Sequence, residues 1–456
     1  MKNQLKNQKP MKNRLKGKDL DYLIQDVDIS KEELEEIIAE ADKIISDDSS
    51  EKNKLIEAYL KKVQCLQNLD KYDESKDFIG KLLVLNQNMP EAIVRLGVVY
   101  CENKEYGKAV CEYNKAIKIN SNYAVAYNNR GVTKYLLKDY CGAIEDYDQA
   151  IEIRSDYVIA YTNRAFVKGD LKDYHGAIED FSKIIEIKPA YTKAYYDRGV
   201  AKYNLNDYLG ATDDFSKTIE INPDIAEAYI NRGEAKRHLS DYLRAIEDFS
   251  KAIEINPGIA EAYINRGKTK YNLKDYHGAI EDFSKAIEIK PDRADVYSLR
   301  GIAKVLLKDF HSAIDDYNKA IEIEPEVEVL YINRGRAKSD LEDYLGAIED
   351  YNKAVEIKPD FAEAFYYRAI AKNYLSDYRH SAEEDYYKAI EIKPYLAEIN
   401  PNNSDNIPII LFPSISLQMY NNHYDEYDYS GGGNGCGEGR ACRNCQNYGC
   451  SAHPHN

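Results

Sequence analysis

Residues 228–259 read AYINRGEAKRHLSDYLRAIEDFSKAIEINPGI, and residues 262–293 read AYINRGKTKYNLKDYHGAIEDFSKAIEIKPDR. The second stretch begins 34 residues after the first and repeats most of it. The same register continues in both directions, and its ten units begin at residues 56, 90, 124, 158, 192, 226, 260, 294, 328 and 362. A period of this length predicts stacked structural repeats instead of two or three separate globular domains.

Each unit, counted from Ala226 as position 1, contains two stretches with helical periodicity. One face of the first stretch carries, at the i, i+3, i+4, i+7 spacing of a helix, Tyr229, Arg232, Gly233 and Lys236. One stripe of the second carries Tyr242, Ala245, Ile246, Phe249, Ala252 and Ile253. Ser240-Asp241 between them predicts an N-cap, and Asn256-Pro257 ends the second helix.

Small and aromatic residues predict how the units pack. Gly233 and Ala245 occupy positions where two helices approach closely, and aromatic side chains fill the space beside them. Position 17 is aromatic in every unit, as Tyr72, Tyr106, Tyr140, Tyr174, Tyr208, Tyr242, Tyr276, Phe310, Tyr344 and Tyr378. A helical hairpin this short cannot bury its own apolar face, so each unit must pack against its neighbours. The sequence therefore predicts an all-α solenoid.

The unit resembles the tetratricopeptide repeat. The residues that match the family's pattern are Tyr229, Gly233, Ala245, Phe249, Ala252 and Pro257, and equivalents recur over residues 56–396. The resemblance implies a right-handed superhelical solenoid of antiparallel helix pairs. It also implies that the first helix of each unit lines a concave groove, in which the family binds peptides or other proteins.

The N-terminal residues before the repeats divide into two segments. Residues 1–29 begin with 18 residues that include seven Lys or Arg and no acid, which predicts a disordered basic arm or a tether for an acidic surface. Residues 30–55 contain a predicted helix with a capping box of Ser30 and Glu33. We expect this helix to cover the open face of the first repeat.

The residues after the repeats form a linker and a tail. The linker, residues 397–430, contains the apolar stretch IPIILFPSISL at 407–417. We expect this stretch to fold back over the last hairpin or into the groove, with an exposed linker as the alternative. The tail, residues 431–456, is rich in Gly, Cys and His.

Three polar positions change together along the chain. From the third repeat onward, position 7 is Arg, position 11 is Lys and position 23 is Asp, whereas repeats one and two lack the set. The Arg residues run from Arg130 to Arg368, and the Asp residues from Asp146 to Asp385. We interpret the set as an Arg–Asp ladder that joins the two helices of each repeat, with an anion-binding stripe as the alternative.

The groove-facing positions implied by the family are 2, 5, 9, 12 and 13, and they vary between copies while the packing positions do not. Such variation is typical of a recognition surface, although a solvated inner wall would vary too. The candidate partner-binding residues are Tyr135, Tyr196, Tyr203, Asn204, Arg237, Tyr271, Asn272, Arg336 and Tyr366.

The tail contains a second candidate site. Its possible ligands are Cys436, Cys442, Cys445, Cys450, His453 and His455. Cys442 and Cys445 form a CxxC pair, a spacing that suits zinc, but a second CxxC at the usual distance is missing. Zinc, disulfide or thiol chemistry, and an unstructured tail all remain open. The four cysteines within the repeats are interpreted as reduced thiols.

Charge and motif content exclude several classes of function. The net charge of −16 argues against nucleic acid and anionic membranes as partners, and no apolar run reaches the length of a membrane span. No arrangement of His, carboxylates or Gly indicates catalysis or a phosphate loop. We therefore expect a cytoplasmic, non-enzymatic scaffold that binds a protein or peptide in its groove, with self-association open. The alternative is a metal- or thiol-dependent adaptor that works through its tail.

Overall fold

The computed structural model describes residues 30–47 and 51–398, and in these ranges every regular element is a helix. An N-terminal helix is α2 (Lys31–Ser46). The first helices of the ten repeats are α3 (Lys52–Asn68), α5 (Pro90–Glu102), α7 (Ala124–Leu136), α9 (Val158–Asp170), α11 (Thr192–Asn204), α13 (Ala226–His238), α15 (Ala260–Asn272), α17 (Ala294–Leu306), α19 (Glu328–Asp340) and α21 (Ala362–Asn373).

The second helices are α4 (Tyr72–Leu85), α6 (Tyr106–Ile119), α8 (Tyr140–Ile153), α10 (Tyr174–Ile187), α12 (Tyr208–Ile221), α14 (Tyr242–Ile255), α16 (Tyr276–Ile289), α18 (Phe310–Ile323), α20 (Tyr344–Ile357) and α22 (Arg379–Ile392). Two short 3-10 helices, η3 (Ser376–Tyr378) and η4 (Pro394–Glu398), flank α22. The predicted alternation of two helices per 34 residues is confirmed in all ten repeats.

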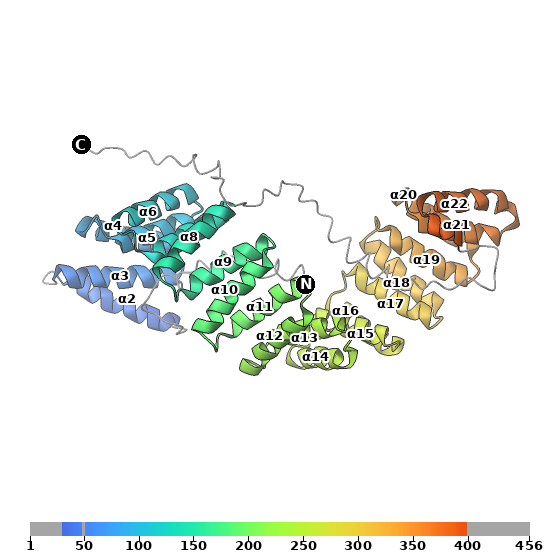
Figure 1. Ribbon diagram of the computed structural model, residues 1–456, viewed down its shortest axis with the longest axis horizontal. Helices are drawn as coiled ribbons and strands as arrows, with labels where there is room; N and C mark the ends of the chain where they lie inside the picture. The colour runs from blue at the N-terminus through green and yellow to red at the C-terminus, as the bar shows by residue number, and fades with distance from the viewer. Residues whose placement is uncertain (1–29, 48–50, 399–456) are drawn as a thin grey trace. The chain divides into compact units, whose positions relative to one another are not determined.

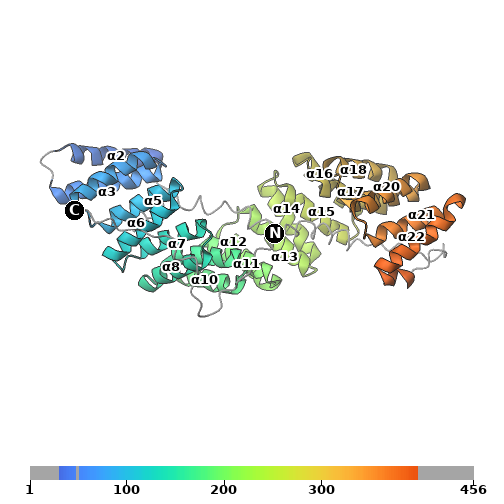
Figure 2. The ribbon, with the colours of Figure 1, turned by 90° about the horizontal axis from the view of Figure 1, so that it is seen from above.

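Helices pack in chain order within two compact units, which divide the described chain between Asp214 and Phe215. Inside each unit the two helices of a repeat are in contact, and the second helix also contacts the first helix of the next repeat, as α16 contacts α17. Figures 1 and 2 show these pairs following one another in series. First helices also touch one another, as α13 touches α15 and α17 touches α19, so they form a shared surface in each unit.

In nine repeats the first helix ends at a turn that contains one residue in the left-handed region of backbone conformation. In repeat 7 the amide of Lys274 donates to Tyr271 and the amide of Asp275 donates to Lys270, both at 2.9 Å, with Lys274 at φ 63°. This is the Schellman arrangement, which normally favours glycine. Residues other than glycine hold a φ of 59–64° at this place in nine repeats, namely Asp70, Lys104, Lys138, Lys172, Asn206, Ser240, Lys274, Lys308 and Glu342.

The residue after this turn is the N-cap of the second helix, and its side chain accepts from the amide three positions later in some repeats and not in others. The amide of Gly278 donates to Asp275 Oδ1 at 3.0 Å, and a Cβ at Gly278 would lie 2.3 Å from Asp275 Oδ2. In repeat 6 the equivalent residue is Arg244, and Asp241 makes no side-chain cap bond. The predicted N-cap at Asp241 is therefore present in position only, and its carboxylate instead accepts from Arg244 Nη1 at 3.3 Å.

Asp275→Ala should cost about 1 kcal/mol of stability, because the cap bond to Gly278 is lost. Asp241→Ala is the matched control, since that carboxylate caps no amide. Hydrogen exchange of the first-turn amides of α16 and α14 measures both effects. Equal acceleration in the two helices would contradict the prediction.

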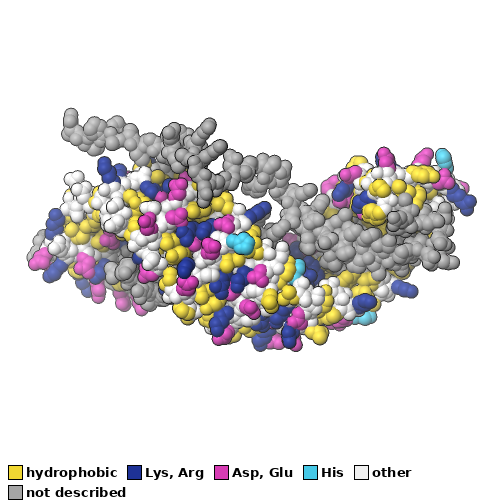
Figure 3. Space-filling model, in the orientation of Figure 1, with side chains coloured by type: hydrophobic (Ala, Val, Ile, Leu, Met, Phe, Trp, Pro, Cys, Tyr) yellow, Lys and Arg dark blue, Asp and Glu magenta, His cyan; other side chains and the backbone are white. Residues whose placement is uncertain are grey.

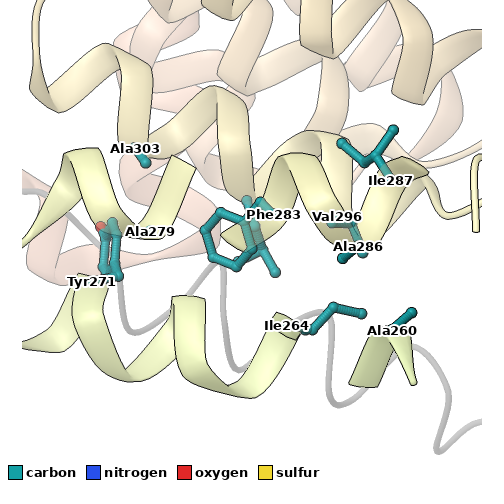
Figure 4. Packing of buried hydrophobic residues seen from close by; sticks show 10 residues of the cluster. Ala260, Ile264, Tyr271, Ala279, Phe283, Ala286, Ile287, Val296 and Ala303 are labelled. Carbon is teal, nitrogen blue, oxygen red and sulfur yellow. The ribbon is translucent and has the colours of Figure 1, made fainter. Parts of the chain in front are cut away.

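The core lies between helices and is built from the small and aromatic positions. Figure 4 shows Phe283 of α16 facing α15, with Ala279 and Ala286 on the same helix. Phe283 is 0% exposed, and a Cβ at Gly267 would lie 2.7 Å from its Cε1 atom. The predicted close approach at Gly233 is confirmed in the same way, because its Cβ would lie 2.8 Å from Phe249 Cε1.

Both ends of the repeat array depart from the pattern. At the N-terminal end, Ser30 and Glu33 form the predicted capping box, and α2 packs on α3 with Leu34 and Ala41 buried. At the other end, the tenth repeat has three residues between Tyr378 and Ala382, where repeat 7 has two between Tyr276 and Ala279, and η3 precedes α22. The predicted basic arm, the apolar stretch at 407–417 and the tail at 431–456 lie outside the described residues.

Candidate functional site

The polar ladder has the same geometry in eight repeats. In repeat 7 Arg266 donates from Nε to Asp282 Oδ2 at 3.0 Å and from Nη2 to Oδ1 at 2.7 Å. Lys270 Nζ lies 2.9 Å from the same Oδ2 atom. Because Asp282 is buried and binds two cations from the first helix, the carboxylate joins α16 to α15. The interpretation of these residues as an Arg–Asp ladder is confirmed. The Asp carboxylates accept from the Arg and Lys N–H groups that an anion would otherwise bind.

The ladder also joins neighbouring repeats, which the sequence interpretation missed. The third guanidinium nitrogen of Arg266, Nη1, donates to Ser250 Oγ of the preceding repeat at 3.0 Å. The same contact reaches Asn318 from Arg334 at 2.7 Å and Asn352 from Arg368 at 2.7 Å. A signal was available, because a polar residue stands 16 positions before every Arg of the ladder.

A row of Asn and Asp side chains on the first helices was also missed, and all of them except the half-buried Asn265 are buried. Position 6 of the repeat is Asn or Asp in six copies, namely Asn129, Asn163, Asp197, Asn231, Asn265 and Asn333. Asn163 Nδ2 donates to Asn128 Oδ1 of the preceding repeat at 3.0 Å, and both residues are buried. Such a bond fixes the register of two first helices. The recurrence of Asn at one position was the signal that could have revealed it.

The nine predicted groove residues all lie on first helices, but their exposure differs. Tyr271 and Tyr366 are buried, at 9% and 6% exposed. Tyr271 packs in a cluster that joins repeats 7 and 8, and Tyr366 packs against α22 and η4 at the end of the array. Figure 4 shows Tyr271 facing Ala279 in the core beside Phe283. The exposed or half-buried members are Tyr135, Tyr196, Tyr203, Asn204, Arg237, Asn272 and Arg336.

The candidates make few contacts with one another. Tyr135 donates to Asp170 of the next repeat at 2.6 Å, and the Tyr203 ring lies 5.2 Å from that of Tyr208. Asn204 Nδ2 donates to the Val200 carbonyl of its own helix at 2.9 Å. Arg336 places its guanidinium 5.0 Å from the ring of Tyr367. Because each of these contacts is made to a different residue, the candidates are spread along the first helices and do not form a compact catalytic cluster.

Charged side chains of α13, α15 and α17 act on one another. Arg237 donates to Glu234 at 3.0 Å, and although burial raises the pKa of Glu234, Arg237 and Lys268 hold it below its usual value. Burial lowers the pKa of Lys268, an effect that Glu234 and Asp295 oppose. Glu234, Arg237 and Lys268 are half-buried at this place, which is consistent with these shifts.

Cysteines in the repeats differ in state. Cys65 and Cys101 are buried free thiols, as predicted. The prediction is wrong for Cys111 and Cys141, which are disulfide-bonded. The six candidate metal ligands between Cys436 and His455 lie outside the described residues, so a zinc site there stays a prediction.

Surface charge and helix length are the two features of the chain that concern contact with a membrane. Figure 3 shows basic and acidic side chains interspersed among apolar ones on the face that it presents. Among residues 30–47 and 51–398, none of the helices combines the length and the hydropathy that crossing a bilayer demands.

Several crystal structures are similar to parts of the chain. A MamA protein is 26% identical over 38% of this chain and 94% of its own, with a TM-score of 0.35. The C-terminal part of a TPR repeat-containing protein from Cytophaga hutchinsonii is 21% identical over 50% and 94%, with a TM-score of 0.44. YrrB, described as a TPR protein with an unusual peptide-binding site, is 21% identical over 40% and 95%, with a TM-score of 0.37. No curated protein matches the chain.

Family models identify the repeats directly. Models of the tetratricopeptide repeat match residues 124–157, 158–191, 226–259, 260–293 and 294–327, and a TPR repeat model matches 97–138 and 335–372. Five of these matches begin where the 34-residue register places a unit. Together with the ten helix pairs and their glycine–aromatic packing, they show that the chain belongs to the tetratricopeptide repeat family.

Proposed function

We propose that the chain is a non-enzymatic scaffold that binds a peptide or helix of a partner protein on the surface formed by its first helices. The observation that carries this proposal is a contrast between positions. Ladder residues such as Arg266 and Asp282 recur in eight repeats, whereas positions 9, 12 and 13 of the same helices differ from copy to copy. Packing alone would favour the same residues at each copy, and a bound partner would favour different ones.

Tyrosine at position 12 is suited to such binding. Tyr135 and Tyr203 are half-buried on α7 and α11, and each ring is held by a second aromatic ring at 5.6 and 5.2 Å. A side chain that is already ordered loses little conformational entropy when a partner packs on it. Tyr271 has the same ring contact with Tyr276, but its burial makes it a poor choice for a binding test.

Tyr203→Ala should weaken partner capture at least tenfold and leave the helical content unchanged. A buried aromatic anchor at a protein interface typically contributes about 2 kcal/mol or more. Affinity capture from the source organism, with quantitative mass spectrometry, compares the full-length chain with this variant. Tyr387→Ala is the control, because Tyr387 is 69% exposed on the second helix α22.

A protein captured by the wild type and by Tyr387→Ala but lost with Tyr203→Ala supports the proposal. If Tyr203→Ala captures the same proteins in the same amounts, the first-helix surface of this part of the chain is not the binding site.

A further inference from the structure

The second helix of the last repeat, α22, exposes a face that the other repeats use to bind their successor (Figures 1 and 2). In repeat 7 this face of α16 carries Ile280, which packs on the cluster that joins repeats 7 and 8, and Ser284, which accepts from Arg300 of repeat 8 at 3.0 Å. The tenth repeat has Glu383 and Tyr387 at these two positions. Within the described ranges only η4 follows α22, and both side chains are exposed, Tyr387 at 69%.

One stripe of α22 carries four exposed side chains at four-residue spacing. They are Arg379, Glu383, Tyr387 and Glu391, and residues four apart lie on the same face of a helix. Glu391 pairs with Lys388 at 2.7 Å on its own helix. The stripe therefore combines a cation, two acids and a large aromatic ring on a face that no described repeat covers.

The charges at the two ends of this stripe are unfavourably placed in a single helix. α22 begins with Arg379 and His380, has no acid in its first turn and has no side-chain cap bond at its N-terminus. A cation beside the positive end of a helix dipole is unfavourable, and so is an anion such as Glu391 beside the negative end. A second α22 that lies antiparallel reverses both effects, because it brings the C-terminal end of one helix beside the N-terminal end of the other.

The stripe is also self-complementary when two copies of α22 lie antiparallel. Arg379 and Glu391 stand six residues to either side of Asp385, and Glu383 and Tyr387 stand two residues to either side of it. A twofold axis at the level of Asp385 therefore brings Arg379 beside the partner's Glu391, and Glu383 beside the partner's Tyr387. Each contact occurs twice, because such an interface uses the same surface of both copies.

The N-terminal end of the array does not offer a matching surface. α2 covers α3, and its exposed side carries three acids, Glu32, Glu36 and Glu40. In a head-to-tail contact these acids would face Glu383 and Glu391 of α22, and like charges brought together at an interface are repulsive. Charge therefore favours contact between two C-terminal ends over contact between opposite ends.

We propose that two copies of the chain associate through α22, packed antiparallel about a twofold axis. In this dimer the Arg379 guanidinium donates to the partner's Glu391 carboxylate, and the Tyr387 hydroxyl donates to the partner's Glu383. The two tyrosine rings supply the apolar contact near the axis. The dimer carries two copies of the first-helix surface, so it binds a protein with two recognised segments more tightly than one copy does. One copy is sufficient to capture a protein on its first helices, so this inference is independent of the function proposed above.

Analytical ultracentrifugation of the full-length chain over a range of concentrations tests the proposal. The wild type should show a reversible equilibrium between monomer and dimer. Arg379→Glu and Glu391→Arg should each weaken dimerisation about tenfold or more, because each change turns two attractive contacts into repulsive ones. The double variant with both changes should return the dissociation constant to within about threefold of the wild type, since the two charges are only exchanged.

The double variant separates a contact between copies from one within a copy. Arg379 and Glu391 are about 18 Å apart along their own helix, so they cannot compensate each other inside one chain. Arg244→Glu is the matched control, because Arg244 is an exposed cation in the first turn of the second helix α14. It should leave the equilibrium unchanged, and circular dichroism should show the same helical content in all four variants.

Three outcomes would overturn the proposal. The first is a wild type that stays monomeric at every concentration, and the second is a dimer that neither single variant weakens. The third is a double variant that dimerises no better than the single variants do. If the wild type is monomeric but a variant with a Gly-Ser linker in place of residues 407–417 dimerises, the occupant of the α22 face is this apolar stretch of the same chain and not a second copy.

Discussion

Asp282→Ala should destabilise repeats 7 and 8 by about 3–5 kcal/mol, the typical cost of removing one partner from a buried ion pair. The carboxylate is buried and neutralises both Arg266 and Lys270, so its loss leaves two cations facing each other in a recessed site. Ser250 and the Gly278 carbonyl then remain as their only acceptors among the described residues. Neither of these acceptors carries a charge.

The measurement is hydrogen exchange in α15 and α16, because a repeat array can open locally without a single unfolding transition. Asp292→Ala removes the same charge from an exposed loop and should change stability by less than about 0.5 kcal/mol. Asp282→Asn should fall between the two, since it keeps the shape and an acceptor. If Asp282→Ala lowers the local stability as little as Asp292→Ala does, the ladder does not stabilise the fold.

Local periodicity made the fold predictable from the sequence. Apolar residues at helical spacing predict the helices, and Pro257 predicts the end of α14. The pair Gly233 and Phe249 predicts where two helices meet. Ten copies of the unit repeat these signals. The register could therefore be assigned without any contact map. The same logic predicted the ladder within a repeat, because Arg, Lys and Asp appear and disappear together.

Features that depend on neighbouring repeats were harder to predict. The link from Arg266 to Ser250 crosses between copies, and no single unit shows it. Burial of Tyr271 also depends on packing against the next repeat, and burial of Tyr366 depends on the elements that follow α21. A position that the family uses for binding was therefore partly a packing position in this chain. Lys268 is half-buried as well, which a helical wheel does not reveal.

Gly267→Ala should destabilise repeat 7 by about 1–3 kcal/mol, the usual cost of overpacking a filled core. The new methyl group would lie 2.7 Å from Phe283 Cε1, and Phe283 is fully buried, so the ring cannot move into solvent. Gly80→Ala is the control with the opposite sign, because nothing lies within 4 Å of its Cβ and alanine favours a helix by about 1 kcal/mol over glycine.

Repeat 4 already carries a methyl group at the position that corresponds to Gly267. Its position 8 is Ala165 opposite Phe181, and a small cavity lined by both residues opens beside them. Phe283→Leu removes ring atoms at the point of contact, so Gly267→Ala should cost less in that background than in the wild type. Chemical denaturation of the four proteins in this cycle gives the coupling between the two positions. Additive effects would mean that Gly267 is kept for a reason other than the ring, whereas a coupling of about 1 kcal/mol or more would make the glycine–aromatic contact the element that sets the distance between the two helices of a repeat.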